Sequence, residues 1–223
     1  NANDAVSMVN TAEGALDEIT TMLQRMRELA VQAGTGTTDA ADRTYLQSEF
    51  TALRTEIDRI ADNTQWNGRN ILDGSAGAST GKSTVAFGIG QDGTAAQTLS
   101  TSFGNFNNTT GKLSGLASKV ITGTTIASAI TVAAAAITEI DVVIADVSAQ
   151  RASFGAVSNR LTHAVDSLTN TKTNSEAARS RVLDTDYAAA TSELARTQII
   201  QQAGTAMLAQ ANQLPQTVLA LLQ

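Results

Sequence analysis

The feature that most constrains this chain is a run of apolar residues near its start, spaced four and three residues apart. After Ala5 the run continues with Val9, Ala12, Leu16, Ile19, Leu23, Met26 and Ala30. This spacing places them on one stripe of an α-helix, the pattern of a helical seam. It predicts one helix over residues 3–33, roughly 45 Å long, which ends at the glycine-containing loop 34–36.

The same spacing returns after a short loop. Thr38 and Asp39 give a helix start signal, and the apolar positions that follow are Leu46, Phe50, Leu53, Ile57 and Ile60. The pattern stops at Asn67-Gly68, which predicts a second helix over residues 40–63. Because the connecting loop is short, we expect the two helices to form an antiparallel hairpin.

Residues 67–125 differ in kind, since Gly, Ser, Thr and Asn dominate and the helical period is lost. Two β-prone stretches, 83–89 and 95–103, flank Gln91-Asp-Gly93. An Asp-Gly step between such stretches is a hairpin signal. We therefore predict one β-hairpin in this segment.

The helical pattern returns at about Ile130. One face carries Ile137, Ile140, Ile144, Val147, Phe154, Leu161, Val165 and Leu168, with Arg151 and Ser158 interrupting it. This pattern predicts a third helix over residues 130–172. Asp184-Thr-Asp186 then offers an N-cap and a negative first turn for a fourth helix, from about Thr185 to Asn212, which we expect to end near Pro215. Its apolar face, formed by Leu194, Ile200, Ala203, Met207 and Leu208, has too little to pack on alone.

Together these elements predict a mainly α fold, an elongated antiparallel bundle of long coiled-coil-like helices with a small β-hairpin insertion. Only 4% of residues are aromatic, which agrees with thin seams rather than a thick core. The expected division is an N-terminal helical hairpin of a rod-like core (1–66), a short insertion (67–125), a C-terminal core helix (126–180) and a terminal helix (181–223). The seam is expected to contain Leu16, Ile19, Leu23, Met26, Phe50, Leu53, Ile57, Ile144, Val147, Phe154 and Leu161.

Composition excludes several functions. The chain has no cysteine, so disulfides, thiolate metal sites and thiol nucleophiles are ruled out. Its net charge is −6 and it has no lysine or arginine run, which argues against nucleic acid as a partner. The apolar stretches 126–137 and 218–222 read as too short or too interrupted to cross a membrane. No cleavable signal peptide is recognised, and because the sequence opens within a helical pattern, we expect that its natural N-terminus is missing.

Several motifs imitate catalytic or binding sites. Gly88-Ile-Gly90-Gln-Asp-Gly93 has the spacing of a dinucleotide fingerprint but precedes a strand-like stretch instead of a helix. The stretch 76–83 resembles a phosphate-binding loop, with alanine in place of its first glycine. His163 is the only histidine and has no cysteine or second histidine to share a metal. The Asp184 and Asp186 pair is explained first by helix capping. These readings predict no enzyme, no metal and no cofactor.

Trp66, the sole tryptophan, has two readings. Its ring could stack on a carbohydrate, or it could anchor the end of the second helix by packing. Its position favours the anchor.

The chain strongly resembles bacterial flagellin at both ends. At the N-terminal side the resemblance lies in Asn1-Ala-Asn-Asp-Ala-Val-Ser-Met-Val9, Thr11-Ala-Glu-Gly-Ala-Leu16, Leu23-Gln-Arg-Met-Arg-Glu-Leu-Ala-Val-Gln32, Glu56-Ile-Asp-Arg-Ile60 and Thr64-Gln-Trp-Asn-Gly68. At the C-terminal side it lies in Arg151-Ala-Ser-Phe-Gly-Ala156, Asn159-Arg-Leu161, Ser180-Arg-Val-Leu-Asp-Thr-Asp186 and Gln202-Ala-Gly-Thr-Ala-Met-Leu-Ala-Gln-Ala-Asn-Gln213. It implies a non-enzymatic subunit that polymerises with its own copies into the flagellar filament for swimming motility. It also implies that the segment after about Arg181 belongs to the innermost tube of that filament.

The resemblance also implies partners and a location. These are an export chaperone, the filament cap and junction proteins, and a Toll-like innate immune receptor of a host. The protein would be extracellular, exported through the flagellar type III channel. The implied receptor and inter-subunit contacts are Gln24, Arg25, Glu28, Leu29, Gln32 and, on the facing helix, Glu49. From the residues alone, four of these positions, Gln24, Arg25, Glu28 and Gln32, lie mostly off the seam and read as a solvated helix face, with Arg25 and Glu28 at pairing distance. The alternative function is a cell-surface flagellin-like protein that binds an extracellular polysaccharide, which an exposed Trp66 would favour.

Overall fold

The computed structural model describes residues 1–77, 83–90, 97–107 and 110–220. The chain divides into two compact units, Asn1–Leu168 and Thr169–Gln223. The boundary lies within a single long helix.

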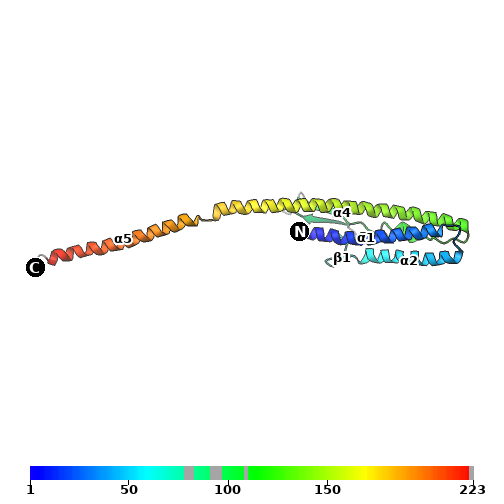
Figure 1. Ribbon diagram of the computed structural model, residues 1–223, viewed down its shortest axis with the longest axis horizontal. Helices are drawn as coiled ribbons and strands as arrows, with labels where there is room; N and C mark the ends of the chain where they lie inside the picture. Colours follow the sequence, from blue (N-terminus) through cyan, green and yellow to red (C-terminus); the bar gives the residue numbers. More distant parts are fainter. Residues whose placement is uncertain (78–82, 91–96, 108–109, 221–223) are drawn as a thin grey trace. The chain divides into compact units, whose positions relative to one another are not determined.

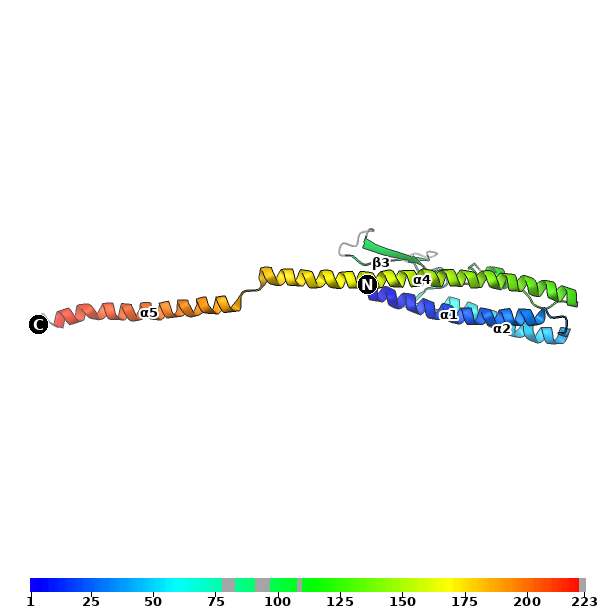
Figure 2. The ribbon, with the colours of Figure 1, turned by 45° about the horizontal axis from the view of Figure 1, so that its top comes forward.

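The first unit is built around two antiparallel helices, α1 (Ala2–Ala33) and α2 (Ala40–Asn63). The N-terminal part of α4 (Ile126–Leu183) runs along α1 (Figures 1 and 2). The fold class is confirmed, and α2 begins and ends at the predicted residues. Helix α4 extends beyond the predicted 130–172 at both ends. It starts earlier because the Thr125 hydroxyl caps it by accepting from Ser128 N–H at 3.2 Å, and it continues because the polar residues after 172 need no apolar stripe to remain helical.

The loop after α1 closes the end of that helix. The last four carbonyl oxygens of a helix lack partners inside it. Here each of them accepts a hydrogen bond from the loop or from α2. Gly34 N–H donates to Ala30 O and the Thr35 hydroxyl to Val31 O. Gln32 O accepts from Thr35 N–H and from the Thr38 hydroxyl, and Ala33 O accepts from Arg43. The Arg43 side chain is only 3% exposed, and its Nε lies 3.1 Å from Ala33 O. The turn between the two helices is therefore held by hydrogen bonds on every terminal carbonyl.

Two small antiparallel ribbons follow α2. Strands β1 (Gln65–Trp66) and β2 (Arg69–Asn70) enclose Asn67 and Gly68, whose φ angles are 50° and 75°. Positive φ at both positions is the requirement of a tight hairpin turn. The sequence pattern predicts only a helix stop at Asn67-Gly68, so this ribbon is an addition to the predicted fold. The short α3 (Ser114–Ala117) is a second element that the pattern does not predict.

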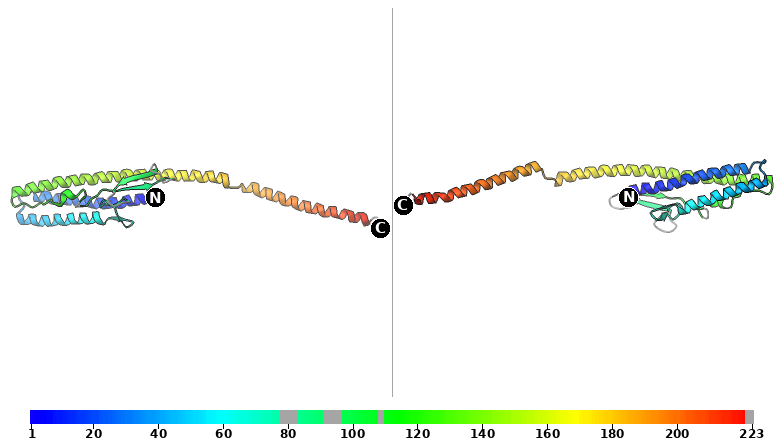
Figure 3. Two further views of the ribbon diagram at one scale, coloured as in Figure 1. Left: turned by 180° about the vertical axis from the view of Figure 1, so that it is seen from behind. Right: turned by 60° about the horizontal axis from the view of Figure 1, so that its bottom comes forward.

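The second ribbon confirms the predicted hairpin. Strand β3 (Thr84–Gly88) pairs antiparallel with β4 (Thr98–Ser102), with Thr84 opposite Ser102 and Gly88 opposite Thr98. The expected turn at Gln91-Asp-Gly93 lies outside the described residues. Figure 3 shows this ribbon beside α4 from two further directions.

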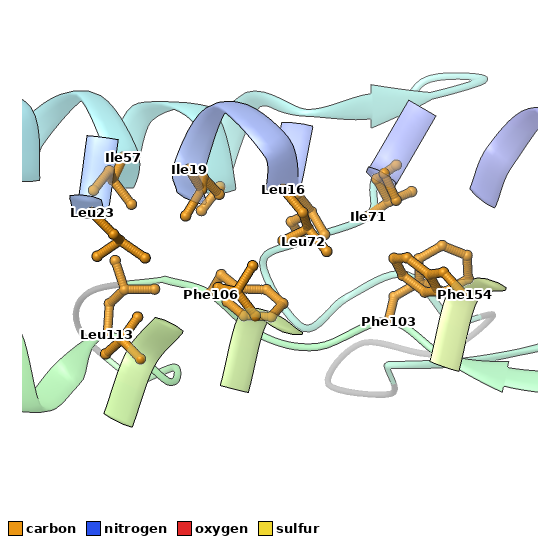
Figure 4. Packing of buried hydrophobic residues seen from close by; sticks show 14 of the residues in the cluster. Leu16, Ile19, Leu23, Ile57, Ile71, Leu72, Phe103, Phe106, Leu113 and Phe154 are labelled. Atoms are coloured by element: carbon orange, nitrogen blue, oxygen red, sulfur yellow. The ribbon is translucent and has the colours of Figure 1, made fainter. Parts of the chain in front are cut away.

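The core of the first unit draws on the helices and on the segment between α2 and α4. The predicted seam residues are fully buried, except Leu53 and Ile144, which are half-buried and pack against the core. The connecting segment adds its own buried residues, among them Ile71, Leu72, Phe103, Phe106 and Leu113 (Figure 4). The rings of Phe103 and Phe154 lie 5.1 Å apart at 50°, a favourable tilted arrangement. The segment predicted as an insertion is therefore part of the core.

The second unit consists of the end of α4 and of α5 (Tyr187–Ala220). The predicted N-cap is confirmed at Asp186, whose Oδ1 accepts from Ala188 N–H at 3.0 Å and from Ala189 N–H at 3.2 Å. Asp184 instead closes α4, since its N–H donates to Ser180 O at 2.8 Å. The prediction that α5 ends near Pro215 is wrong. A proline removes one internal hydrogen bond, and the residues that follow it still continue the helix.

One helical stretch is long and apolar enough, by length and composition alone, to cross a bilayer. It lies within Ile126–Asn212, and its most apolar window of 18 residues has a mean hydropathy of 1.8, with 28% of that window buried. The expectation rested on single apolar runs, whereas this measure averages over 18 residues, including several alanines. Within this range, α4 places Ala136, Ile140 and Val143 in the core of the first unit.

Candidate interaction surface on α1

The outer face of the last turns of α1 carries an ordered set of charges. Arg25 Nε lies 2.8 Å from Glu49 Oε1 on α2, and Arg25 Nη1 lies 3.0 Å from Glu28 Oε2 on α1. These hydrogen bonds, first to Glu49 and then to Glu28, raise the pKa of Arg25 above its ordinary value. All three side chains remain substantially exposed, so the pairs contribute little to stability. Their effect is to fix the direction in which Arg25 and both carboxylates face.

A hollow of about 500 Å³ lies beside this charge cluster. It is lined by Gln24, Arg27, Glu28, Val31 and Gln32. Val31 is 51% exposed and is the apolar element of the lining. Arg27 is held from the other side, since its Nε lies 2.7 Å from Asp141 Oδ1 on α4, and this hydrogen bond raises its pKa. The hollow thus combines one exposed valine with two amides and with two charged groups, Arg27 and Glu28, that each form an ion pair.

The six contact residues implied by the resemblance differ in exposure. Gln24, Arg25, Glu28 and Gln32 are exposed on α1, and Glu49 is exposed on α2. Leu29 is fully buried in the core, so its side chain supports this face from beneath and does not lie on it. We name the exposed residues, together with Arg27 and Val31, the α1 face.

Arg27 and Val31 were not singled out from the sequence, although a signal was present. They follow Gln24 at steps of three and four residues, the spacing that places side chains on one side of a helix. Arg151 was noted only as an interruption of the α4 seam. It forms ion pairs with Asp17 at 3.1 Å and Glu13 at 3.9 Å on α1. These pairs explain why a positively charged arginine can stand at a position of the apolar seam.

The motifs that imitate catalytic sites do not form such sites in the described residues. Gly88 is the last residue of β3, while Gly93 and most of the phosphate-loop imitation lie outside the described residues. His163 is exposed on α4. In the part of the chain that the structure describes, no three His, Asp or Glu side chains gather to hold a metal ion. Trp66 is half-buried and packs against the core, as the anchor reading predicts, so the exposed ring that would favour polysaccharide binding is not found.

Comparison with known proteins gives matches at both ends of the chain. Residues 1–77 match the bacterial flagellin N-terminal helical region, and residues 137–222 match the bacterial flagellin C-terminal helical region. The chain is 40% identical over 223 residues to a flagellin of Halalkalibacterium halodurans, covering all of this chain and 76% of that protein. It is also 40% identical over 242 residues to the flagellin of Bacillus subtilis, covering all of this chain and 79% of that protein. Among solved structures, Bacillus cereus flagellin superposes with a TM-score of 0.60 at 31% identity, covering 80% of this chain and 93% of that one.

Proposed function

We propose that the α1 face is a contact surface in the flagellar filament, because the chain belongs to the bacterial flagellin family. It is a structural subunit that polymerises with other flagellin subunits into this extracellular filament. The observation that carries this proposal is the hollow around the exposed Val31, whose charged lining residues Glu28 and Arg27 form ion pairs with Arg25 on α1 and with Asp141 on α4. A small apolar centre with an ordered polar rim is the usual anatomy of a protein interface.

Co-sedimentation with sheared flagellar filaments tests this contact. Val31→Asp places a charge in the hollow, and we expect it to reduce binding to filament ends and their elongation, seen by sedimentation and electron microscopy. Val142→Asp is the matched control, since Val142 on α4 is exposed to a similar degree, 53% against 51% for Val31. Equal binding by the two variants would remove the α1 face from the assembly.

We further propose that a host Toll-like receptor recognises the same face, through Gln24, Arg25, Glu28, Gln32 and Glu49. The ion pairs support this proposal because they hold the charged groups in place before a partner arrives, so less ordering is needed on binding. A receptor on this surface would compete with a neighbouring subunit. The proposal therefore predicts that the receptor binds the monomer and not the filament.

Receptor affinity distinguishes this proposal from a merely solvated helix face. Arg25→Ala removes the group that joins both carboxylates, and we expect affinity for the receptor ectodomain to fall by about tenfold or more. Arg59→Ala is the control, since Arg59 makes a comparable ion pair with Glu56 on α2 and is not part of the α1 face. Unchanged affinity of Arg25→Ala would contradict receptor recognition through this face.

For export we propose passage of the unfolded chain through the flagellar type III channel without a cleaved signal peptide, assisted by an export chaperone, followed by addition beneath the filament cap. The absence of cysteine and the single proline support this route. Neither a covalent cross-link nor several slow peptide-bond isomerisations can then hold the chain in a folded form. The chain should appear in the medium of cells with an intact flagellar export apparatus and stay inside cells that lack it.

A further inference from the structure

We propose that Asn67 is a site of self-modification, at which the side-chain amide is converted through a cyclic imide into aspartate or isoaspartate. Asn67-Gly68 is the only Asn-Gly step in the sequence. It occupies the turn between β1 and β2, with positive φ at both residues. This inference concerns the covalent chemistry of the chain and is independent of the α1 face.

The reaction needs only the chain and water. The backbone nitrogen of Gly68 attacks Cγ of Asn67, and a bond between them forms as the Cγ–Nδ2 bond breaks. Ammonia leaves, carrying the proton that Gly68 N–H gave up, and a five-membered imide remains. Water then opens the ring at either carbonyl. One product is aspartate, and the other is isoaspartate, in which the main chain runs through the former side chain.

The structure leaves both reacting groups accessible. Asn67 and Gly68 are exposed, and a Cβ placed on Gly68 would meet no atom within 4 Å. Among the hydrogen bonds of the described residues, none holds the Asn67 side chain. The attack requires rotation of the Asn67 backbone out of its native conformation. Opening the β1–β2 ribbon costs little free energy, because the two strands share only two residue pairs, Gln65 with Asn70 and Trp66 with Arg69. A ribbon this short is weakly stable.

A second step of the same kind lies nearby and is protected. The carboxylate of Asp73, which precedes Gly74, accepts from Ser75 N–H at 2.8 Å, from Ser75 Oγ at 2.6 Å and from Asn70 Nδ2 at 3.1 Å. A Cβ on Gly74 would lie 3.0 Å from Asn105 Nδ2, so the backbone there is crowded. Asp73 is also ionised at neutral pH, which makes its carboxylate a poor target for a nucleophile. The contrast directs the reaction to Asn67.

The products would alter the ribbon itself. Isoaspartate adds one backbone atom to a turn that accepts two residues of fixed conformation, and both products add a negative charge close to Arg69. The pairing of Trp66 with Arg69 would then be lost or shifted. Trp66 packs against the core from this ribbon, so its ring would become more exposed to water.

Peptide mapping of the folded chain tests the site. After incubation in mildly alkaline buffer, we expect the mass gain of amide hydrolysis, together with isoaspartate, at Asn67, many-fold above the level at Asn10 and Asn159, which are exposed but lie within helices. Asn67→Gln should abolish the signal, since its longer side chain closes a less favourable ring. A folded chain that stays intact at Asn67 while the urea-unfolded chain reacts would overturn the proposal, and so would no reaction in either.

The sole tryptophan reports the structural consequence. Modified and unmodified chains differ by one charge and can be separated by anion exchange. The modified fraction, which contains both products, should show Trp66 emission shifted to longer wavelength, while Asn67→Gln incubated in parallel should show no change with time. Identical emission from both fractions would mean that the ribbon survives the modification, and the proposed opening would be wrong.

Discussion

Two polar side chains of the first unit, Arg43 and Thr101, are buried, but only Arg43 has hydrogen-bond partners among the described residues. The guanidinium of Arg43 donates to main-chain oxygens at the end of α1. Thr101 is 4% exposed on β4, and its hydroxyl has no hydrogen-bond partner among the described residues. A buried polar group without a partner loses its bonds to water and gains nothing in return. The first residue should therefore stabilise the fold, and the second should weaken it.

Thr101→Val removes the unpartnered hydroxyl and keeps the branched shape. We expect the free energy of unfolding to rise by about 1 kcal/mol, measured by urea denaturation. Thr84→Val, at an exposed position of β3, is the control and should change it by less than about 0.5 kcal/mol. A less stable Thr101→Val chain would indicate that the hydroxyl has a partner after all.

Arg43→Met replaces the buried side chain with a shorter, unbranched apolar one and removes its donors. The carbonyl of Ala33 then loses its partner, and we expect a loss of about 1.5 to 3 kcal/mol in the free energy of unfolding. Arg59→Met removes an arginine that is exposed on the same helix and should have little effect. Equal stability of the two variants would show that the hydrogen bonds of Arg43 do not hold the end of α1.

Asp73 gives a prediction about pH. Burial alone would raise the pKa of its carboxyl group, but hydrogen bonds from Ser75 and Asn70 outweigh burial and lower it. Because the pKa is lower in the folded state, the ionised carboxylate stabilises the fold at pH values above the pKa of the unfolded chain. This stabilisation is lost as the pH falls through the lower pKa of the folded state. The stability advantage of the wild type over Asp73→Asn should thus be full at neutral pH and shrink below about pH 4. A difference that is constant with pH would contradict this assignment.

At the scale of elements, the long helix α4 has a glycine in its interior, a residue that weakens helices. Gly155 lies within this helix of 58 residues, and a Cβ added there would meet no neighbouring atom within 4 Å. Gly155→Ala should raise the free energy of unfolding by about 0.5 to 1 kcal/mol, because alanine loses less backbone freedom on folding. Thermal unfolding measures the gain.

Gly34 provides the matched control for that substitution. A Cβ there would lie 3.3 Å from Ala133 Cβ, close enough that the neighbour must shift. Gly34→Ala should therefore gain less than Gly155→Ala or lose stability. The reverse order would show that space around the new Cβ does not decide the effect.

The helices could be predicted from the sequence because each buries an apolar stripe that recurs at the helical period. The seam of α1 and both ends of α2 follow directly from this pattern. The long ends of α4 could not be found in this way, since polar residues after 172 carry no stripe, and the end of α5 was misplaced because a proline was read as a stop. The role of Ile71, Phe103 and Phe106 in the core also escaped, as isolated apolar residues in a polar segment have no period to reveal them.

The α1 face was only partly predictable for a similar reason. The exposed residues share one side of the helix, but the fixed positions of Arg25 and Arg27 depend on Glu49 and Asp141. These partners lie on other helices, and no local spacing brings them to notice. Leu29, a contact residue implied by the resemblance, is buried by packing.

For the whole molecule, the two units differ in how their apolar side chains are covered. The first unit buries its seams, whereas Leu194, Ile199, Ile200, Met207 and Leu208 in the second unit are 58 to 71% exposed. A helix without packing partners is marginally stable in water. Backbone amides of α5 up to Asn212 should therefore exchange hydrogen much sooner than those of α1, as followed by mass spectrometry. Equal protection would mean that something covers α5 in solution.

The ion pairs of α1 also span very different lengths of chain. Arg25 and Glu49 are 24 residues apart, while Arg27 and Asp141 are 114 apart. Closing the longer loop takes more conformational entropy and more time, so the hairpin of α1 and α2 should form first and α4 should dock later. In the interval, the side of α1 that α4 will cover is open to water and to other chains. A newly made subunit is then most exposed to association with the wrong surface before it has finished folding.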